Sequence, residues 1–514
     1  MLINNKKLKD DLFILIKSLT KSEKGYIKKF ALRHRNKSGN NYIMLLDEIE
    51  KQTKKNKYDE LFLKQKFTDK HFVKNFPVAK AYVYETILRS LNSYYTNSNK
   101  DNELKEKVRS IEILYRKALY PQCLKLLKRT KAEARRYDNF TQQLELIKWE
   151  RNLIHEGAYP GEPYENLERT YKEEKEILLK IQNIGDYRMM SYRILNTGRK
   201  PQGSVSIKEF LNNPLLQNEE EALSFPAKIN FHHIRAAIFD AAEDTLNAYR
   251  ERRKTVEIME QYPEKIKENR INYLISLYNL TSMCYKLKYY DELSACLGKI
   301  RSIPEKVSKG ISENIRMLMF VGPSTLSLKM YIDKGEFEKG TWEAEEIQKK
   351  LAEYDNKLNP SDKLACIYYL AYVYFGAGKY KEALFWLNKI LNEKSEYREI
   401  TNSAAILNMI VHYELKNFEL LEYLIKSTYR RLRKQKILSE FEQELLQFLR
   451  KTPAIVSTSE LNDVLSETKN VITNLNDDKH SEYFDFKSWL ESKITGKQFS
   501  DIVKEKYHRT QPQN

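Results

Sequence analysis

One stretch, residues 364–395, has a helix–turn–helix pattern that recurs along this chain of 514 residues. Its apolar residues follow the i, i+3, i+4, i+7 spacing that places side chains on one face of a helix. They are Ile367, Leu370, Ala371 and Tyr374. Gly378 then interrupts the pattern where a helix C-cap needs a positive φ, and a second apolar face follows. The stretch therefore predicts two amphipathic helices joined by a tight turn, the first opening at Asn359-Pro360.

Weaker copies of this junction occur at 118–123, 288–293, 333–337 and 416–421. Measured at the aromatic residue after the turn, Tyr290 to Phe337 is 47 residues, Phe337 to Tyr380 is 43, and Tyr380 to Phe418 is 38. Regular repetition of this kind is typical of solenoids, in which each repeat packs only on its neighbours. A solenoid also allows a chain of this length without a single oversized core.

The stretch resembles a tetratricopeptide repeat, a helix–turn–helix unit of about 34 residues. Residues of the expected kind stand at its consensus positions, namely Leu370-Ala371, Tyr374, Gly378, Tyr380, Ala383 and Ile390. Ile367 replaces the usual Trp, no Pro ends the second helix, and the intervals exceed the family's length. The resemblance implies a right-handed α-solenoid in a bacterial protein, with repeats over 265–435 and degenerate helical repeats over 101–261.

The composition agrees with helices, because charged residues make up 31% of the chain, Gly and Pro are few, and no alternating strand pattern is present. We therefore predict an all-α fold.

The four cysteines, at 123, 284, 296 and 366, form no CxxC pair, so we expect buried thiols in a reducing compartment. The longest apolar stretch, 367–377, is shorter than the ~20 residues that span a bilayer. We expect a cytoplasmic protein that does not insert into membranes.

Residues 1–96 are predicted to form a basic N-terminal helical module. Residues 1–100 hold 22 Lys or Arg against 10 Asp or Glu, a net charge of +12 out of +18 for the whole chain. Such an excess attracts nucleic acid, an anionic membrane or an acidic partner, although a Lys-rich composition alone also produces it. Thr20 and Glu23 fit a capping box, and Pro77 suits the first turn of a further helix.

A DNA-reading helix-turn-helix at 58–95 is disfavoured. The junction 69–76 is longer than the usual turn of 3–4 residues, and the helix after Pro77 is apolar nearly all round, which predicts burial rather than contact with a groove of DNA.

At the C-terminal end, residues 436–507 are predicted to be capping helices, with a capping box at Ser457–Glu460 and a final amphipathic segment over 484–507. Residues 508–514 are expected to be a frayed tail.

No catalytic motif is found. Gly376-Ala-Gly-Lys379 lacks the upstream Gly and the following Ser or Thr of a phosphate-binding loop. His232 and His233 are adjacent, so on a helix they point about 100° apart and do not share a metal ion. We expect no cofactor, no metal site and no enzymatic activity.

The tetratricopeptide resemblance implies that the first helix of each repeat lines a concave groove. The corresponding residues here are Tyr278, Ser282, Tyr285, Lys286, Lys329, Tyr368, Tyr372, Phe375 and Tyr413. An aromatic groove with scattered cations suits a peptide segment of acidic character. The alternative is that some of these tyrosines pack between helices that are longer than usual for the family. The predicted function is therefore a protein–protein interaction scaffold, in which replacing Tyr368 and Tyr372 with Ala abolishes binding and leaves the fold intact.

A second interpretation is a nucleic-acid-linked regulator. In layout the chain resembles the bacterial peptide-sensing regulators that join an N-terminal DNA-binding domain to a repeat array. The basic module would then contact nucleic acid while the repeats sense a ligand or peptide.

Overall fold

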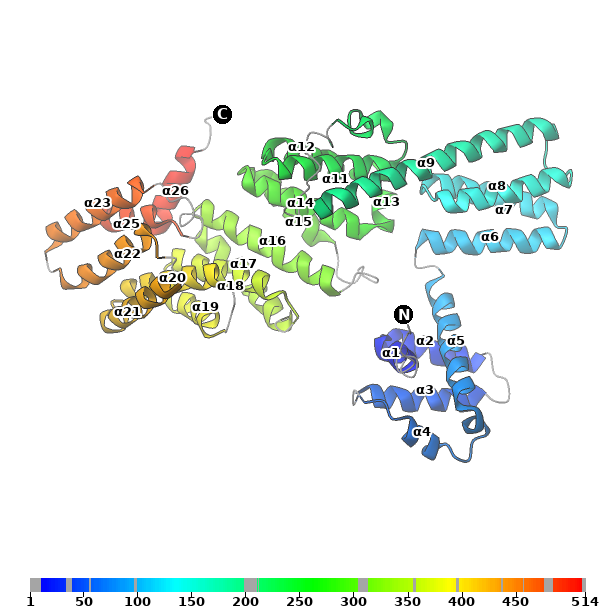
Figure 1. The fold of residues 1–514 in the computed structure, drawn as a ribbon, viewed down its shortest axis with the longest axis horizontal. Coiled ribbons are helices and arrows are strands. Elements are labelled where there is room, and N and C mark those ends of the chain that lie inside the picture. The colour runs from blue at the N-terminus through cyan, green and yellow to red at the C-terminus, as the bar shows by residue number, and fades with distance from the viewer. Residues whose placement is uncertain are drawn as a thin grey trace. The chain divides into compact units, whose positions relative to one another are not determined.

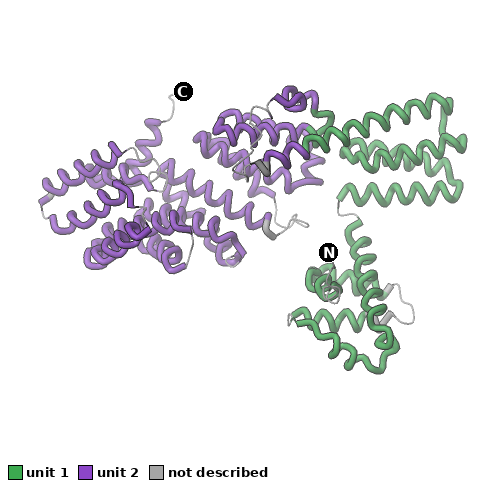
Figure 2. The backbone as a smooth tube through the Cα atoms, viewed as in Figure 1, with its two compact units in different colours: residues 1–188, 222–227 green, residues 189–221, 228–514 purple. Residues whose placement is uncertain are grey.

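The computed structural model describes residues 11–33, 39–54, 57–96, 99–197, 210, 212–303, 313–354, 357–393, 397–435, 438–455, 457–475 and 484–510. The structure is 85% helical, and these residues contain no strand (Figure 1). The predicted all-α fold is confirmed. The chain divides into two compact units, residues 1–188 with 222–227 and residues 189–221 with 228–514 (Figure 2). This division crosses a helix, whereas the predicted boundaries lay at 96–101 and 261–265.

Five α-helices begin unit 1: α1 (Asp11–Ser18), α2 (Lys21–Arg33), α3 (Gly39–Lys54), α4 (Glu60–Lys66) and α5 (Phe76–Tyr95), with a 3-10 turn, η1 (His71–Asn75), before the last. They share an apolar core that includes Ile16, Leu45, Leu63, Phe76 and Ile87. The predicted capping box is confirmed, because the Thr20 N–H donates to Glu23 Oε2 at 2.6 Å and the Glu23 N–H to Thr20 Oγ1 at 3.3 Å.

The prediction that the helix after Pro77 is buried all round is wrong. Val78, Tyr82 and Leu88 on α5 are 58%, 41% and 40% exposed. The buried residues follow a narrower stripe, because α5 packs on α1, α2 and α3 along one side only. The junction between α4 and α5 is long, as predicted, since it runs from Phe67 to Asn75.

Three more helices belong to unit 1, namely α6 (Lys100–Arg116), α7 (Tyr120–Arg136) and α8 (Phe140–His155), whereas α9 (Pro163–Thr197) begins in unit 1 and continues into unit 2 from residue 189. Between α7, α8 and α9 lies a buried ion cluster. Lys131, 5% exposed, is paired with Glu150 and, at 2.6 Å, with Glu173 Oε2, while Arg169 reaches Glu150 Oε1 at 2.6 Å. Burial would raise the pKa of Glu150, but its contacts with Lys131 and Arg169 outweigh that effect and hold the pKa below the ordinary value. Each buried charge here therefore has a partner.

Unit 2 continues the helix pairs. Two 3-10 turns, η2 (Pro214–Leu216) and η3 (Glu219–Glu221), precede α11 (Phe225–Ala241), α12 (Thr245–Glu260), α13 (Pro263–Glu268), α14 (Arg270–Lys286), α15 (Tyr290–Ser302), α16 (Glu313–Asp333), α17 (Phe337–Tyr354), α18 (Pro360–Gly376), α19 (Tyr380–Asn392), α20 (Arg398–Glu414) and α21 (Phe418–Gln435). Along this series α14 packs on α16, α16 on α18, and α18 on α20, and each also packs on the helix that follows it. The predicted start of α18 is confirmed, because Asn359 Oδ1 accepts from the Ser361 N–H at 2.9 Å.

The C-terminal part holds α22 (Glu440–Lys451), η5 (Thr452–Ala454), α23 (Thr458–Asn474), α25 (Phe486–Thr495) and α26 (Phe499–Thr510). The predicted single segment over 484–507 is two helices, because Gly496 takes φ +71° and ends α25. Residues 508–510 are helical, so the predicted frayed tail is wrong for them, and 511–514 lie outside the described residues.

One turn joins most of the helix pairs in both units. Its central residue has a positive φ and lies two residues before the next helix, except at Gly157, where a loop precedes α9. These central residues are Ala118, Asp138, Gly157, Glu243, Lys288, Gly335, Gly378 and Lys416. In each turn the next N–H returns to a carbonyl of the last helical turn, as from Lys379 to the Tyr374 oxygen at 2.8 Å. The five turns predicted from the sequence are confirmed. The turn at Asp138 is followed by Phe140, the aromatic signal that could have revealed it.

Removing backbone strain at one of these turns should stabilise the chain. Lys288 has φ +59°, and Gly adopts this conformation without the steric cost of a Cβ. We expect Lys288→Gly to raise the free energy of unfolding by roughly 0.5–1 kcal/mol in urea denaturation followed by circular dichroism. The matched change Gly378→Ala, at φ +72° with open space around the added Cβ, should lower it by about 1 kcal/mol. Equal signs for the two variants would contradict the strain argument.

The N-terminal module should lose stability in acid through Glu60. Burial raises the pKa of this carboxyl, but its ion pairs with Lys80 and Lys64 prevail and lower the pKa from 4.5 to about 2. A carboxylate with a depressed folded-state pKa stabilises above pH 4.5, and that contribution is lost as the pH falls toward 2. Glu60→Gln should therefore flatten the dependence of the urea midpoint on pH across this window, as followed by tyrosine fluorescence. An unchanged slope would rule out this contribution.

Candidate functional site

Residues 484–510 run back across the ends of the first helices of unit 2. On α25, Trp489 Nε1 donates to Glu414 Oε1 at 2.6 Å, and the indole lies 5.6 Å from the ring of Tyr413, both at the end of α20. Phe484 packs on the end of α18, with its ring 5.0 Å from that of Tyr372 and 5.3 Å from that of Phe375. This segment therefore covers two neighbouring helix pairs.

Helix α26 extends the same path to earlier pairs. The ring of Phe499 is 5.6 Å from that of Phe337 at the start of α17. A Cβ on Gly335 would lie 2.8 Å from the backbone nitrogen of Lys504, so only Gly allows α26 to approach this turn. Tyr507 packs 5.8 Å from Tyr290 at the start of α15. The C-terminal helices thus do not simply cap the last repeat, as predicted, but bridge four helix pairs.

This arrangement corrects part of the predicted groove. Tyr368 is 0% exposed, and Tyr372 and Phe375 are buried, because α18 is surrounded by neighbouring helices and by Phe484 and Phe499. The Asp485 N–H donates to Tyr372 Oη at 3.0 Å, and Tyr413 is half-buried beside Trp489. At these positions the groove is filled by the chain's own C-terminal residues rather than open to a partner.

The remaining predicted residues lie on α14 and α16. Tyr278 is half-buried and closely packed, since a Cβ on Gly322 would come within 2.5 Å of its ring. Ser282 Oγ donates to the carbonyl of Tyr278 at 3.1 Å, and Lys286 is exposed. Of the nine predicted residues, the structure brings Tyr285, Lys329 and Tyr372 together around one cavity.

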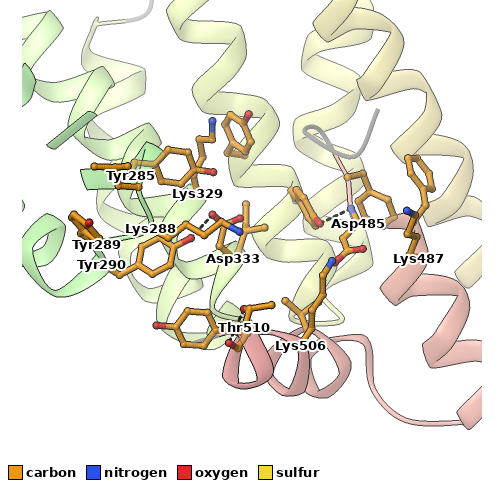
Figure 3. Close-up of a pocket in the computed structure, with 18 of the residues that line it drawn as sticks. Tyr285, Lys288, Tyr289, Tyr290, Lys329, Asp333, Asp485, Lys487, Lys506 and Thr510 are labelled. Carbon is orange, nitrogen blue, oxygen red and sulfur yellow. Dashed lines mark hydrogen bonds and ion pairs between the residues drawn. The ribbon is translucent and has the colours of Figure 1, made fainter. Parts of the chain in front are cut away.

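This cavity, of about 770 Å³, lies between the α14–α16 end of the series and the C-terminal helices (Figure 3). One wall carries Tyr285, Lys288, Tyr290, Lys329 and Asp333, and the facing wall carries Asp485, Lys487, Lys506, Tyr507 and Thr510. Sequence reasoning missed the second wall completely. No local pattern could have revealed it, because the two walls are more than 150 residues apart in the chain.

On the first wall, Asp333 is a half-buried carboxylate with partners on several sides. Tyr290 Oη donates to Asp333 Oδ2 at 2.8 Å. Burial raises the pKa of Asp333, although hydrogen bonds from Tyr290 and Tyr285 and the charge of Lys329 act against it. Burial and the neighbouring Asp333 also raise the pKa of both tyrosines. Lys329 Nζ lies 4.5 Å from the centre of the Tyr285 ring, a cation–π contact.

On the facing wall, Asp485 is fully engaged as the N-cap of α25. It accepts from the Ser488 N–H at 3.1 Å, from Ser488 Oγ at 2.7 Å and from Lys506 Nζ at 2.7 Å. Lys487 and Lys506 are exposed, as is Lys288 across the cavity. Each ammonium has three N–H donors, whereas both carboxylates are already satisfied by the chain. The cavity's spare hydrogen-bonding capacity is therefore cationic and donating, which suits an anionic group.

Other chemical groups do not converge in this way. His232 contacts Glu251 Oε2 at 2.7 Å, whereas His233 contacts Ser276 Oγ at 3.2 Å on another helix. Across the described residues, no group of three or more His, Cys, Asp or Glu is placed to hold a metal ion. All four cysteines are buried, as predicted, and are not paired in disulfides. In the same residues, no helix combines the length and apolarity needed to cross a bilayer.

The packing of α26 against Gly335 can be tested by mutation. A Cβ there would meet the backbone of Lys504 and Ser500 at 2.8 and 2.9 Å, whereas one on Gly378 would meet nothing within 4 Å. We expect Gly335→Ala to release α26, so that limited proteolysis cuts residues 499–510 several-fold faster than in the Gly378→Ala control. Equal cleavage rates for the two variants would show that α26 does not depend on this contact.

Searches of protein-family models, of curated proteins and of solved structures find no match to this chain. The tetratricopeptide resemblance therefore remains a prediction from the residues, and the structure supports an all-α helical-repeat fold.

Proposed function

We propose that this chain is a non-enzymatic interaction scaffold that binds an acidic segment of a partner protein in the cavity between α14, α16 and the C-terminal helices. The observation that carries the proposal is the imbalance of the cavity's polar groups. Four lysines line it against two aspartates that already accept hydrogen bonds from the chain itself. Lys506 is paired with Asp485 and Lys329 lies over the ring of Tyr285, so the proposal depends on the exposed Lys288 and Lys487. A carboxylate of the partner would use donors that the chain leaves available.

The aromatic lining explains why a peptide segment suits this cavity better than a free ion. The rings of Tyr285, Tyr290, Tyr369 and Tyr507 offer large apolar surfaces with polar edges, the combination common in peptide-binding sites. The volume lies within the ~300–1,000 Å³ of typical ligand pockets, which is enough for a few side chains. Acidic residues would set the orientation while apolar side chains supply the contact area.

The double Ala variant of Tyr368 and Tyr372 is not a clean test, because both side chains are buried and their loss would remove packing. Charge reversal at the rim avoids this problem. Lys288 and Lys487 are exposed, so Lys288→Glu with Lys487→Glu should leave the helical circular-dichroism signal unchanged and weaken partner binding at least tenfold. Lys349→Glu with Lys381→Glu is the matched control, since both lysines are exposed on α17 and α19 away from the cavity.

The partner itself can be captured with a photo-crosslinking amino acid at Tyr289, which lines the cavity and is 42% exposed. The crosslinked protein is identified and purified, and its affinity for the variants is measured by calorimetry. Equal affinities for the rim variant and its control would exclude the cavity as the binding site. Capture that disappears after nuclease treatment would instead favour the nucleic-acid-linked regulator suggested by residues 1–96.

A further inference from the structure

Helix α9 carries a long apolar stripe on its exposed side. Its members recur every seven residues and are Tyr164, Tyr171, Leu178 and Gly185, all within unit 1. Tyr164, Tyr171 and Leu178 are 78%, 56% and 50% exposed. The opposite side of the helix is buried through Thr170, Ile177, Ile184 and Tyr187. An apolar stripe of this length on a water-exposed helix is typical of an interaction surface.

Within unit 1, Tyr171 and Gly185 lie at equal distances on either side of Leu178, seven residues away in each direction. When a helix pairs with a copy of itself around a two-fold axis, residues at equal distances on either side of the axis face each other. In such a pair, the residues on one side of the axis must fit the residues at equal distances on the other side, and the residues of this stripe meet that condition.

We propose that α9 pairs antiparallel with α9 of a second copy of this chain, with the two-fold axis at Leu178. Leu178 then faces Leu178 of the second copy, and each Tyr171 ring faces Gly185. The glycine lacks a Cβ, and the space around it is open, because an added Cβ would meet nothing within 4 Å. A large side chain opposite a small one allows the helix axes to approach closely. The seven-residue period keeps the stripe continuous in a left-handed pair.

Charges beside the stripe are arranged in the same antiparallel sense. In a two-fold pair, each flank of one helix meets the same flank of the other. On one flank, Asp186 of the second copy comes beside Lys172 and Lys175. All three side chains are exposed. Opposite charges therefore meet beside the axis.

The self-association is tested on the full chain by sedimentation velocity over a concentration series. We expect a dimer, and Leu178→Asp should abolish it, because two carboxylates would face each other across the axis. Ile113→Asp is the matched control, since Ile113 is 48% exposed on α6, outside the stripe, against 50% for Leu178. A monomer at every concentration, or a Leu178→Asp variant that still dimerises, would overturn the proposal and leave the stripe to a different protein.

Cysteine crosslinking tests the orientation, with little background because the four native cysteines are buried. Leu178→Cys should form a disulfide between copies. Tyr171→Cys mixed with Gly185→Cys should crosslink, whereas Tyr171→Cys alone should not. Crosslinking of Tyr171→Cys alone would indicate a parallel pair and contradict the proposal. Asp186→Lys should weaken the dimer at least fivefold, and Lys172→Glu with Lys175→Glu should restore it.

Discussion

A three-residue turn with a positive φ at its centre sets the architecture of this chain. It ends one helix with hydrogen bonds back to the last turn and starts the next helix almost at once, so the two helices fold back on each other. At Lys288 and Lys416 the central residue is not Gly, and each such residue costs about 1 kcal/mol in strain. After Lys288, the burial of the aromatic residue Tyr290 offsets this cost.

The C-terminal segment adds contacts that a simple repeat array does not have. In a solenoid each repeat contacts only its neighbours. Here Trp489, Phe499 and Tyr507 contact α20, α17 and α15 in turn, so one segment joins helix pairs that are not consecutive in the series, such as α14–α15 and α20–α21. Unit 2 should for this reason unfold more cooperatively than an array held only by nearest neighbours. The same segment builds the second wall of the cavity.

The two proposed surfaces follow from different physical features. The cavity depends on half-buried carboxylates that are satisfied within the chain, as Asp333 is by Tyr290, while Lys288 and Lys487 are exposed at its rim. The stripe on α9 depends on apolar side chains that are exposed to solvent, such as Tyr164 and Tyr171. Loss of one surface by mutation should leave the other intact, because they share no residue.

Local sequence determined the helices, the cap at Asn359 and five of the positive-φ turns, because these depend on side-chain periodicity and on interactions a few residues apart. The tertiary structure alone decided which aromatic residues face solvent. Tyr368 and Tyr372 have the spacing of groove residues, yet both are buried, and Phe484 from the distant C-terminal segment packs on Tyr372. The sequence predicts burial of Val78 and Tyr82, yet both are exposed because other helices cover α5 on one side only. Burial depends on contacts between distant segments, and those contacts leave no pattern in the sequence near either partner.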